Sequence, residues 1–183
     1  MAKTFAKWRD ETPKHFRFSA KVPRSVTHFG KLQKNFEDLE EFFKRVGELG
    51  EKFYGALAQL PPSLAFDANV FETFLKEVRL HYKGKLFIEP RHKSWEGADF
   101  KHYGVLPVRS DPLFVDVKPL EPAYFRLHGS PKLYYSGYEE NFLQDLALQL
   151  KQYKEAVVVF NNTASGAAIQ NALRLMELTG ETQ

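Results

Sequence analysis

The feature that most constrains the fold is a steady alternation of short apolar runs with segments of helical periodicity. Several of the runs are nearly continuously apolar, which is typical of strands that are covered on both faces. Strands that alternate with helices at this spacing form right-handed crossovers and a parallel sheet. The sequence predicts six strands: Phe16–Val22, Phe53–Leu60, Lys85–Pro90, Val105–Ser110, Ala123–Gly129 and Ala156–Asn162.

The segments between these runs carry the end signals of helices. Asn35 and Asp67 are predicted N-caps, and Trp95 begins a short helix. A helix over Tyr138–Tyr153 follows the fifth strand, and Ser165 opens the last helix, which is predicted to end at Gly180. The predicted inner face of this last helix consists of Ile169, Ala172, Leu173 and Met176.

Length and composition favour one domain over residues 1–183 in a reducing compartment. The chain has no cysteine, so disulfides, thiolate metal sites and a cysteine nucleophile are excluded. No targeting segment is visible at the front, and the longest apolar runs, such as Ala156–Phe160, are far too short to cross a bilayer. We therefore expect a cytoplasmic protein that does not contact membranes.

Polar residues follow all six predicted strands, although the strand interiors are apolar. An open sheet usually concentrates its polar groups at one switch point, so polar groups at every strand end favour a barrel. The expected fold class is α/β, a parallel TIM-type barrel. The residues at the strand ends are Lys21 and His28, Gln59, Glu89 and Arg91, Asp111, Arg126 and His128, and Asn161 and Asn162.

Two pairs at these strand ends have the i, i+2 spacing that places both side chains on one face, Glu89 with Arg91 and Arg126 with His128. Arg126 is predicted to lie one layer deeper than His128. A buried cation needs a partner, and we expect that partner to be Glu89.

The residue types at the strand ends favour an anionic or hydroxyl-rich small ligand. Cations and amides dominate, and carboxylates are too few for a two-metal hydrolase. A single metal on Glu89, Asp111 and His128 is a less favoured alternative, so we expect neither metal nor cofactor. The loop from Asn161 to Gly166, which runs into a helix start, either binds phosphate or only caps the helix.

The best interpretation is an enzyme or enzyme remnant that binds an anionic or phosphorylated small molecule, although activity itself is left open. The predicted catalytic residues are His128, Glu89 and His28. The predicted substrate-binding residues are Lys21, Gln59, Arg91, Arg126, Asp111, Asn161 and Asn162. Binding of nucleic acid is an alternative, supported by a pI near 8.9 and by the aromatic loop Tyr134–Tyr138, although a net charge of +3 argues against it.

Several motifs, in order and at the expected spacing, resemble those of the YecE-like family, the domain of unknown function 72 (DUF72). The resemblance implies a TIM-type barrel without an established activity, with its pocket at Lys21, His28, Gln59, Glu89, Arg91, Arg126, His128 and Asn161. Pro90 departs from the family pattern, which usually has an aromatic or aliphatic residue there. The motifs are Phe18–Pro23 with Thr27 and His28, Gln59–Ser63, Glu89–Trp95, Tyr124–Gly129, and Phe160–Thr163 with Gly166 and Ala167.

The resemblance also implies that the front of the barrel is absent. Members of the family usually begin with two further βα units, whereas this chain begins inside a segment, Thr4–Thr12, that resembles the helix before the third strand. The barrel would then be incomplete, with about six strands and five or six helices, and with open edges at Phe16–Val22 and Ala156–Asn162. Three interpretations follow, in order of preference: an inactive fragment, completion by a second polypeptide, or pairing with a second copy.

Overall fold

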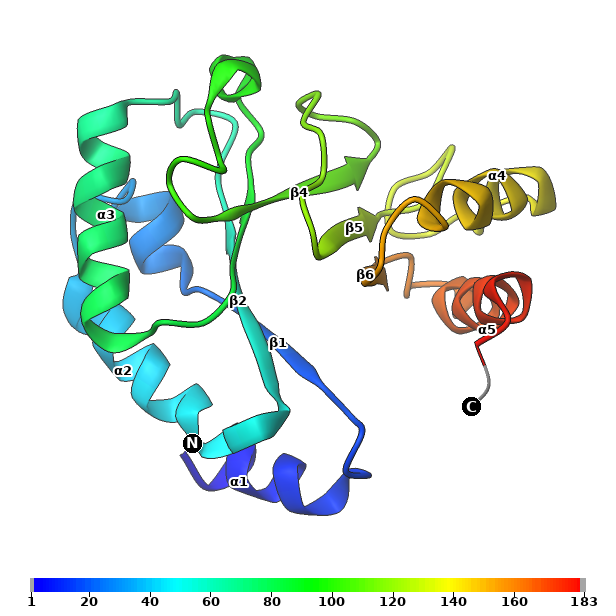
Figure 1. Ribbon diagram of the computed structural model, residues 1–183, viewed down its shortest axis with the longest axis horizontal. Helices are drawn as coiled ribbons and strands as arrows, with labels where there is room; N and C mark the ends of the chain where they lie inside the picture. Colours follow the sequence, from blue (N-terminus) through cyan, green and yellow to red (C-terminus); the bar gives the residue numbers. More distant parts are fainter. Residues whose placement is uncertain (1, 182–183) are drawn as a thin grey trace. The chain divides into compact units, whose positions relative to one another are not determined.

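The structure is a computed structural model that describes residues 2–181. The chain divides into two compact units, Met1–Val105 and Leu106–Gln183. Each unit contains three parallel strands with helices between them (Figure 1). This confirms the predicted fold class, an α/β protein whose parallel strands form an incomplete barrel. Among residues 2–181, no helix is long and apolar enough to cross a membrane.

The first unit is built on the parallel strands β1, β2 and β3. In the ladder, Lys21 is opposite Leu57 and Gln59 is opposite Glu89, so the polar ends of neighbouring strands lie at one edge of the sheet. The elements of this unit are α1 (Ala2–Glu11), β1 (Phe18–Lys21), the π-helical turn η1 (Ser25–Phe29), α2 (Phe36–Val46), the 3-10 segment η2 (Gly47–Lys52), β2 (Phe53–Gln59), α3 (Ala68–His81), β3 (Leu86–Glu89) and the 3-10 helix η3 (Lys93–Gly97).

Aromatic packing holds the loops of the first unit onto α3. The Asp67 carboxylate caps α3 by accepting a hydrogen bond from the Val70 amide at 3.0 Å. Phe71 on the first turn packs edge-to-face against Trp95, with ring centroids 5.0 Å apart. The Trp95 indole N–H donates to the Leu64 carbonyl at 2.9 Å, so this buried ring also satisfies its polar atom.

The second unit has its core between β5, α4 and α5. The buried cluster joins Phe125 and Leu127 of β5 with Leu143 and Leu146 of α4 and Leu175 of α5. The hydrophobic residues of the last strand pack against this cluster, but they are only partly buried. The elements of this unit are β4 (Leu106–Asp111), β5 (Ala123–Leu127), α4 (Glu140–Leu150), β6 (Ala156–Phe160) and α5 (Ala167–Thr179).

All six strands form where the sequence predicts them. Five are shorter than predicted by one to three residues, and β4 keeps the predicted length but begins and ends one residue later. Asn35 stands at the N-cap position of α2, as predicted, but its side chain does not cap the helix. Its backbone is left-handed (φ 64°), and its side-chain amide donates to the Ser25 carbonyl at 2.8 Å. The other predicted start is wrong. Gly166, not Ser165, precedes α5, because the Ser165 hydroxyl donates to the Tyr135 carbonyl.

The predicted inner face of α5 is also wrong. The buried residues of this helix are Ala168, Asn171 and Leu175, whereas Ile169 and Leu173 are 67% and 38% exposed. The helix carries apolar side chains on more than one face, so periodicity alone could not select the face that packs.

Candidate functional site

The predicted site residues form two groups, one at the strand ends of each unit. We call Lys21, His28, Gln59, Glu89 and Arg91 the β1–β3 group. The second set is the β4–β6 group, which consists of Asp111, Arg126, His128, Asn161 and Asn162.

The centre of the β1–β3 group is a buried ion pair. The Glu89 side chain is fully buried at the end of β3, and the Arg91 side chain is 13% exposed. Arg91 donates from Nη2 and Nε to Glu89 Oε1, at 3.0 and 3.2 Å. A buried carboxylate is strongly destabilising without such a partner. The predicted pairing of Glu89 with Arg126, which belongs to the other unit, stays a prediction.

A second contact links β1 to β2 at the same edge of the sheet. Lys21 Nζ donates to Gln59 Oε1 at 2.8 Å, while Gln59 is only 9% exposed and Lys21 is exposed. The amide therefore orients the ammonium group and leaves the lysine charge in contact with solvent. An exposed and oriented ammonium group is suited to bind an anion.

His28 lies in the turn η1, which follows β1, and its ring is oriented by Thr27. The Thr27 hydroxyl donates its single hydrogen to the Pro23 carbonyl at 3.2 Å. With its hydrogen on Pro23, the hydroxyl accepts from His28 Nδ1, which lies 2.9 Å away. The neutral imidazole then carries its lone pair on Nε2, the nitrogen through which it can accept a proton.

The surroundings of His28 keep the imidazole neutral. Partial burial lowers its pKa below the ordinary value, and the positive charges of Arg24, Lys21 and Arg91 lower it further. At neutral pH the ring is therefore a base surrounded by three cations. This arrangement combines proton acceptance with attraction for an anion.

The β4–β6 group is organised by a tyrosine that the sequence places at a helix start and in the aromatic loop Tyr134–Tyr138. The Tyr138 hydroxyl donates to Asp111 Oδ2 at 2.6 Å and accepts from the Gly129 amide at 2.9 Å. Burial and the neighbouring Asp111 carboxylate raise the pKa of Tyr138 well above its ordinary value. Tyr138 is therefore a fixed neutral donor, and Asp111 is held in place by it.

His128 follows β5 and is almost completely buried, at 1% exposure. Its Nδ1 lies 3.2 Å from the Asp111 carbonyl, so Nδ1 carries the hydrogen and donates. Phe114 and Tyr134 pack edge-to-face on the ring. His128 therefore has a fixed tautomer, like His28, but it is much less accessible to a ligand.

The two asparagines after β6 have different roles. Asn161 Oδ1 accepts from Arg126 Nη2 at 3.3 Å. Asn162 is fully buried and donates to the Ser136 carbonyl and to Asn171 Oδ1, both at 3.0 Å. Asn171 in turn exchanges hydrogen bonds with the backbone of Tyr138. Asn162 therefore ties the loop before α4 to α5, and its Oδ1 is the one buried side-chain polar atom in the described residues without a hydrogen-bond partner.

The histidine after β3, His92, forms a hydrogen bond with the backbone. Its Nδ1 accepts from the Ser94 amide at 3.2 Å and lies 2.8 Å from the Ser94 hydroxyl, so the ring caps η3. Among residues 2–181, no three or more His, Asp or Glu side chains are grouped closely enough to hold a metal ion.

Sequence reasoning did not select Arg24, Tyr138 or Asn171. Arg24 lies four residues before His28, so a helical turn there would have placed both on one side, but no helix was predicted over that segment. Asn171 lies on the same face of α5 as the apolar residues Ala168 and Leu175, and a polar residue on an apolar face was a usable signal for a buried hydrogen bond.

We expect Arg24→Gln to raise the pKa of His28 toward the ordinary value, because one of the charges that disfavour protonation is removed. The measurement is an NMR pH titration of the His28 ring protons. Arg174→Gln, in α5 of the other unit, is the control and should leave the titration of His28 unchanged. Equal midpoints for the wild type and Arg24→Gln would show that the Arg24 charge does not contribute to this pKa.

We expect Gly129→Ala to destabilise the fold by about 1–3 kcal/mol. Gly129 has a φ of 92°, and a β-carbon there would lie 2.7 Å from the Ser136 carbonyl oxygen. Gly47→Ala is the control, since Gly47 has a helical φ of −57° and open space around it. Urea unfolding should show this control to be neutral or stabilised, and equal stabilities of the two variants would contradict the strain assigned to Gly129.

The comparisons with known proteins agree with the fold. The family model described as "Protein of unknown function DUF72" matches residues 1–183. A DUF72 family protein of Thermotoga maritima is 30% identical, with a TM-score of 0.82 over 98% of this chain and 80% of that one. A DUF72 family protein of Enterococcus faecalis is 22% identical, with a TM-score of 0.81 over 99% of this chain and 85% of that one, a likeness that shows the fold alone.

No curated protein matches the chain. The chain spans about four fifths of the length of the solved relatives. The absence of two βα units at the front stays a prediction.

Proposed function

Since the chain belongs to DUF72, a family of unknown function, we propose that it binds an anionic small molecule at the β1–β3 group and transfers a proton to or from it. A phosphorylated compound is the class that fits best. The observation that carries this proposal is the neutral His28 ring, oriented through Nδ1 and surrounded by the charges of Arg24, Lys21 and Arg91.

The cations are positioned before any ligand arrives, which lowers the cost of binding. Gln59 holds the Lys21 ammonium group, and Glu89 holds the Arg91 guanidinium. Arg91 donates to one carboxylate oxygen of Glu89 from two of its nitrogens, and its guanidinium has five N–H donors in a fixed planar arrangement. An oxyanion is the ligand that uses donors of this kind from two sides.

His28 supplies the chemistry in this proposal. The lone pair on Nε2 accepts a proton from a hydroxyl or an acidic carbon of the ligand. The proton then occupies a ring whose charge is compensated by the bound anion. Glu89 acts by orienting Arg91, since its carboxylate is fully buried and already accepts two hydrogen bonds.

Asp111, Arg126, His128, Asn161 and Asn162 are proposed as a second set of ligand contacts in the other unit. Their support is the set of fixed donors and acceptors around Tyr138 and Asn171. His128 is the proposed proton carrier of that group, and its burial requires the Tyr134 loop to move before a ligand reaches it.

We expect inorganic phosphate, and phosphorylated sugars more strongly, to bind the chain and raise the pKa of His28. The bound negative charge offsets the three cations, and the rise is measured by NMR titration with and without ligand. Lys21→Gln should weaken binding by roughly tenfold, the loss of one charge-assisted hydrogen bond.

Lys76→Gln, an exposed lysine on α3, is the matched control and should bind like the wild type. Circular dichroism verifies that both variants are folded. Phosphate compounds that bind the wild type and Lys21→Gln equally, or that leave the His28 titration unchanged, would refute the proposal.

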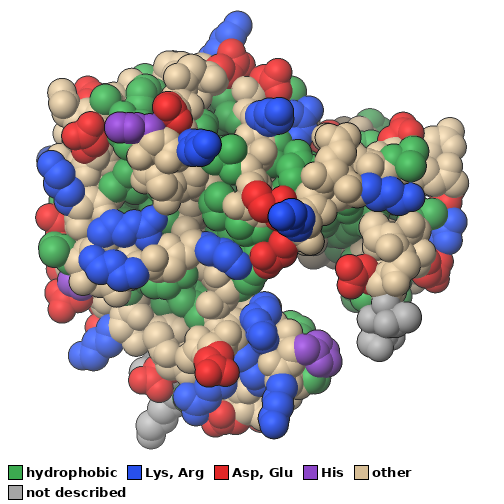
Figure 2. Space-filling model, viewed as in Figure 1, with side chains coloured by type: hydrophobic (Ala, Val, Ile, Leu, Met, Phe, Trp, Pro, Cys, Tyr) green, Lys and Arg blue, Asp and Glu red, His purple; other side chains and the backbone are tan. Residues whose placement is uncertain are grey.

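A second candidate function is stacking on nucleobases by the loop after β5. Tyr134 and Tyr135 are 48% and 49% exposed, and the Lys132 ammonium lies 4.4 Å from the centre of the Tyr135 ring. Exposed rings with a nearby cation bind single-stranded nucleic acid without sequence preference. Figure 2 argues against a dominant role, because Lys and Arg side chains are interspersed with Asp and Glu on the face shown.

Under this second candidate, we expect a short single-stranded oligonucleotide to bind at low salt with an affinity that falls steeply as salt increases. Tyr135→Ala should weaken binding, whereas Tyr54→Ala, in the other unit, should not. Fluorescence anisotropy at several salt concentrations decides between the candidates, since a flat slope or no binding leaves only the small anion.

A further inference from the structure

The segment that follows β3 places a serine hydroxyl directly against an imidazole. Ser94 Oγ lies 2.8 Å from His92 Nδ1, at the start of η3. Ser94 is exposed and His92 is half-buried, so the pair is accessible from solvent. Both residues belong to the motif Glu89–Trp95, but neither has a role in the proposed anion site.

The direction of this hydrogen bond follows from the other contacts of the two groups. The Phe66 amide donates to Ser94 Oγ at 2.7 Å, which leaves the hydroxyl hydrogen available to donate. His92 Nδ1 accepts from the Ser94 amide at 3.2 Å, so in the neutral ring Nδ1 carries a lone pair and Nε2 carries the hydrogen. The serine hydroxyl therefore donates to His92 Nδ1, and its oxygen keeps a second lone pair for another atom.

This tautomer is opposite to that of the other two strand-end histidines. His28 and His128 carry the hydrogen on Nδ1 and direct it to oxygen acceptors. In His92 the same nitrogen is the base, and it already holds the hydrogen of a hydroxyl. A hydroxyl hydrogen-bonded to a neutral imidazole is the arrangement that activates a serine as a nucleophile.

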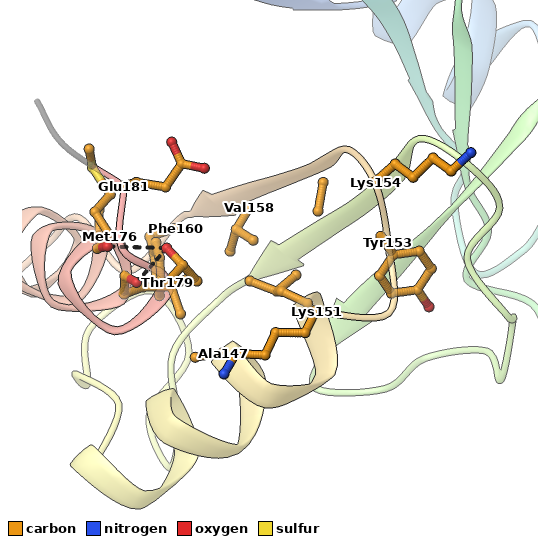
Figure 3. Close-up of a pocket in the computed structure, with 13 residues that line it drawn as sticks. Ala147, Lys151, Tyr153, Lys154, Val158, Phe160, Met176, Thr179 and Glu181 are labelled. Atoms are coloured by element: carbon orange, nitrogen blue, oxygen red, sulfur yellow. Dashed lines mark hydrogen bonds between the residues drawn. The ribbon is translucent and has the colours of Figure 1, made fainter.

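Several other hydroxyl groups of the chain have acceptors that are not bases. At the pocket beside β6, the Thr179 hydroxyl donates to the Leu175 carbonyl at 3.0 Å, inside its own helix (Figure 3). A backbone carbonyl does not take up a proton at neutral pH, so such a hydroxyl is not activated. Ser94 differs because its acceptor is an imidazole. Further hydroxyls that donate to backbone carbonyls are those of Thr12, Thr27, Thr73 and Ser165.

The position of Ser94 is fixed by the packing of η3 against the loop after β2. The Phe66 amide binds the Ser94 hydroxyl, and the Trp95 indole donates to the Leu64 carbonyl at 2.9 Å. The Trp95 ring is buried, and the half-buried Phe66 ring packs against it with centroids 4.9 Å apart. The nucleophile is thus held in place before it reacts, and the residue that binds its hydroxyl offers an apolar ring to an uncharged acyl group.

We propose that Ser94 is a nucleophile that accepts the acyl group of small, uncharged carboxylic esters, with His92 as its general base. The Ser94 oxygen forms a bond to the acyl carbon while its hydrogen passes to His92 Nδ1. The bond from the acyl carbon to the ester oxygen then breaks, and the departing alcohol takes that proton from the ring. Water, deprotonated by the same nitrogen, then adds to the acyl carbon and releases the acid, and the proton returns to Ser94.

The test is covalent labelling of the folded chain with a fluorophosphonate, followed by mass spectrometry of its peptides. Ser94 should carry the label, and Ser94→Ala should abolish it. Ser63→Ala, which removes an exposed serine of the loop after β2, is the matched control and should label like the wild type.

His92→Asn separates the base from the cap. Asparagine retains an acceptor for the Ser94 amide, since it is a favoured N-cap residue, but it cannot take up the hydroxyl proton. Labelling should slow by roughly a hundredfold, the contribution of a general base. Circular dichroism verifies that this variant is folded.

A thiol at the same position keeps the test independent of the reagent. The chain has no cysteine, so Ser94→Cys introduces a single thiol beside His92. It should react with iodoacetamide about tenfold faster or more than Ser63→Cys, because a neighbouring imidazole favours the thiolate. Adding His92→Asn should remove this advantage.

A folded wild type in which Ser94 stays unlabelled, or is labelled no faster than other serines, would overturn the proposal. Equal labelling of the wild type and His92→Asn would show that His92 only caps η3, and equal thiol rates at positions 94 and 63 would show the same. These variants leave Lys21, His28 and Arg91 unchanged, so phosphate binding at His28 succeeds or fails independently of this result.

Discussion

The β1–β3 group depends on the ion pair that Arg91 forms with the fully buried carboxylate of Glu89. Glu89 ends β3 inside the protein, and Arg91, two residues later, donates two hydrogen bonds to the same oxygen. Removing the arginine would take an opposite charge away from a buried carboxylate, a change that is strongly destabilising. The pair therefore fixes a guanidinium at the strand end, and Lys21, oriented by Gln59, lies at the same edge of the sheet.

Buried polar atoms are satisfied in different ways in the β1–β3 group and in the β4–β6 group. Charges contribute in the first unit, where burial and then three cations lower the pKa of His28. Neutral hydrogen bonds dominate in the second, where Tyr138, Asn162 and Asn171 hold the strand-end loops to α5. The His28 ring is partly exposed, whereas the second group is suited to hold a rigid shape. This difference is the reason for placing the proposed chemistry at His28.

The strand-end residues could be predicted because parallel strands place their carboxyl ends together, so the positions of the strands decide which side chains meet. The contact of Lys21 with Gln59 follows from that rule, whereas the sequence predicted Arg126 and not Arg91 as the partner of Glu89. The positions of Arg24 and Thr27 around His28 could not be predicted, since they depend on a π-helical turn that has no clear sequence signal. Tyr138 was missed for a similar reason, because its role depends on the path of the loop between β5 and α4.

The sequence by itself determined the order and type of the elements, the parallel pairing and the residue types at the strand ends, because periodicity and turn residues are local properties. Only the tertiary structure decided which face of α5 is buried and which tautomers His28 and His128 adopt. Those choices depend on contacts between residues far apart in the chain, or on loop geometry. A helix with apolar side chains on two faces, such as α5, does not specify in its own sequence which of them packs inside.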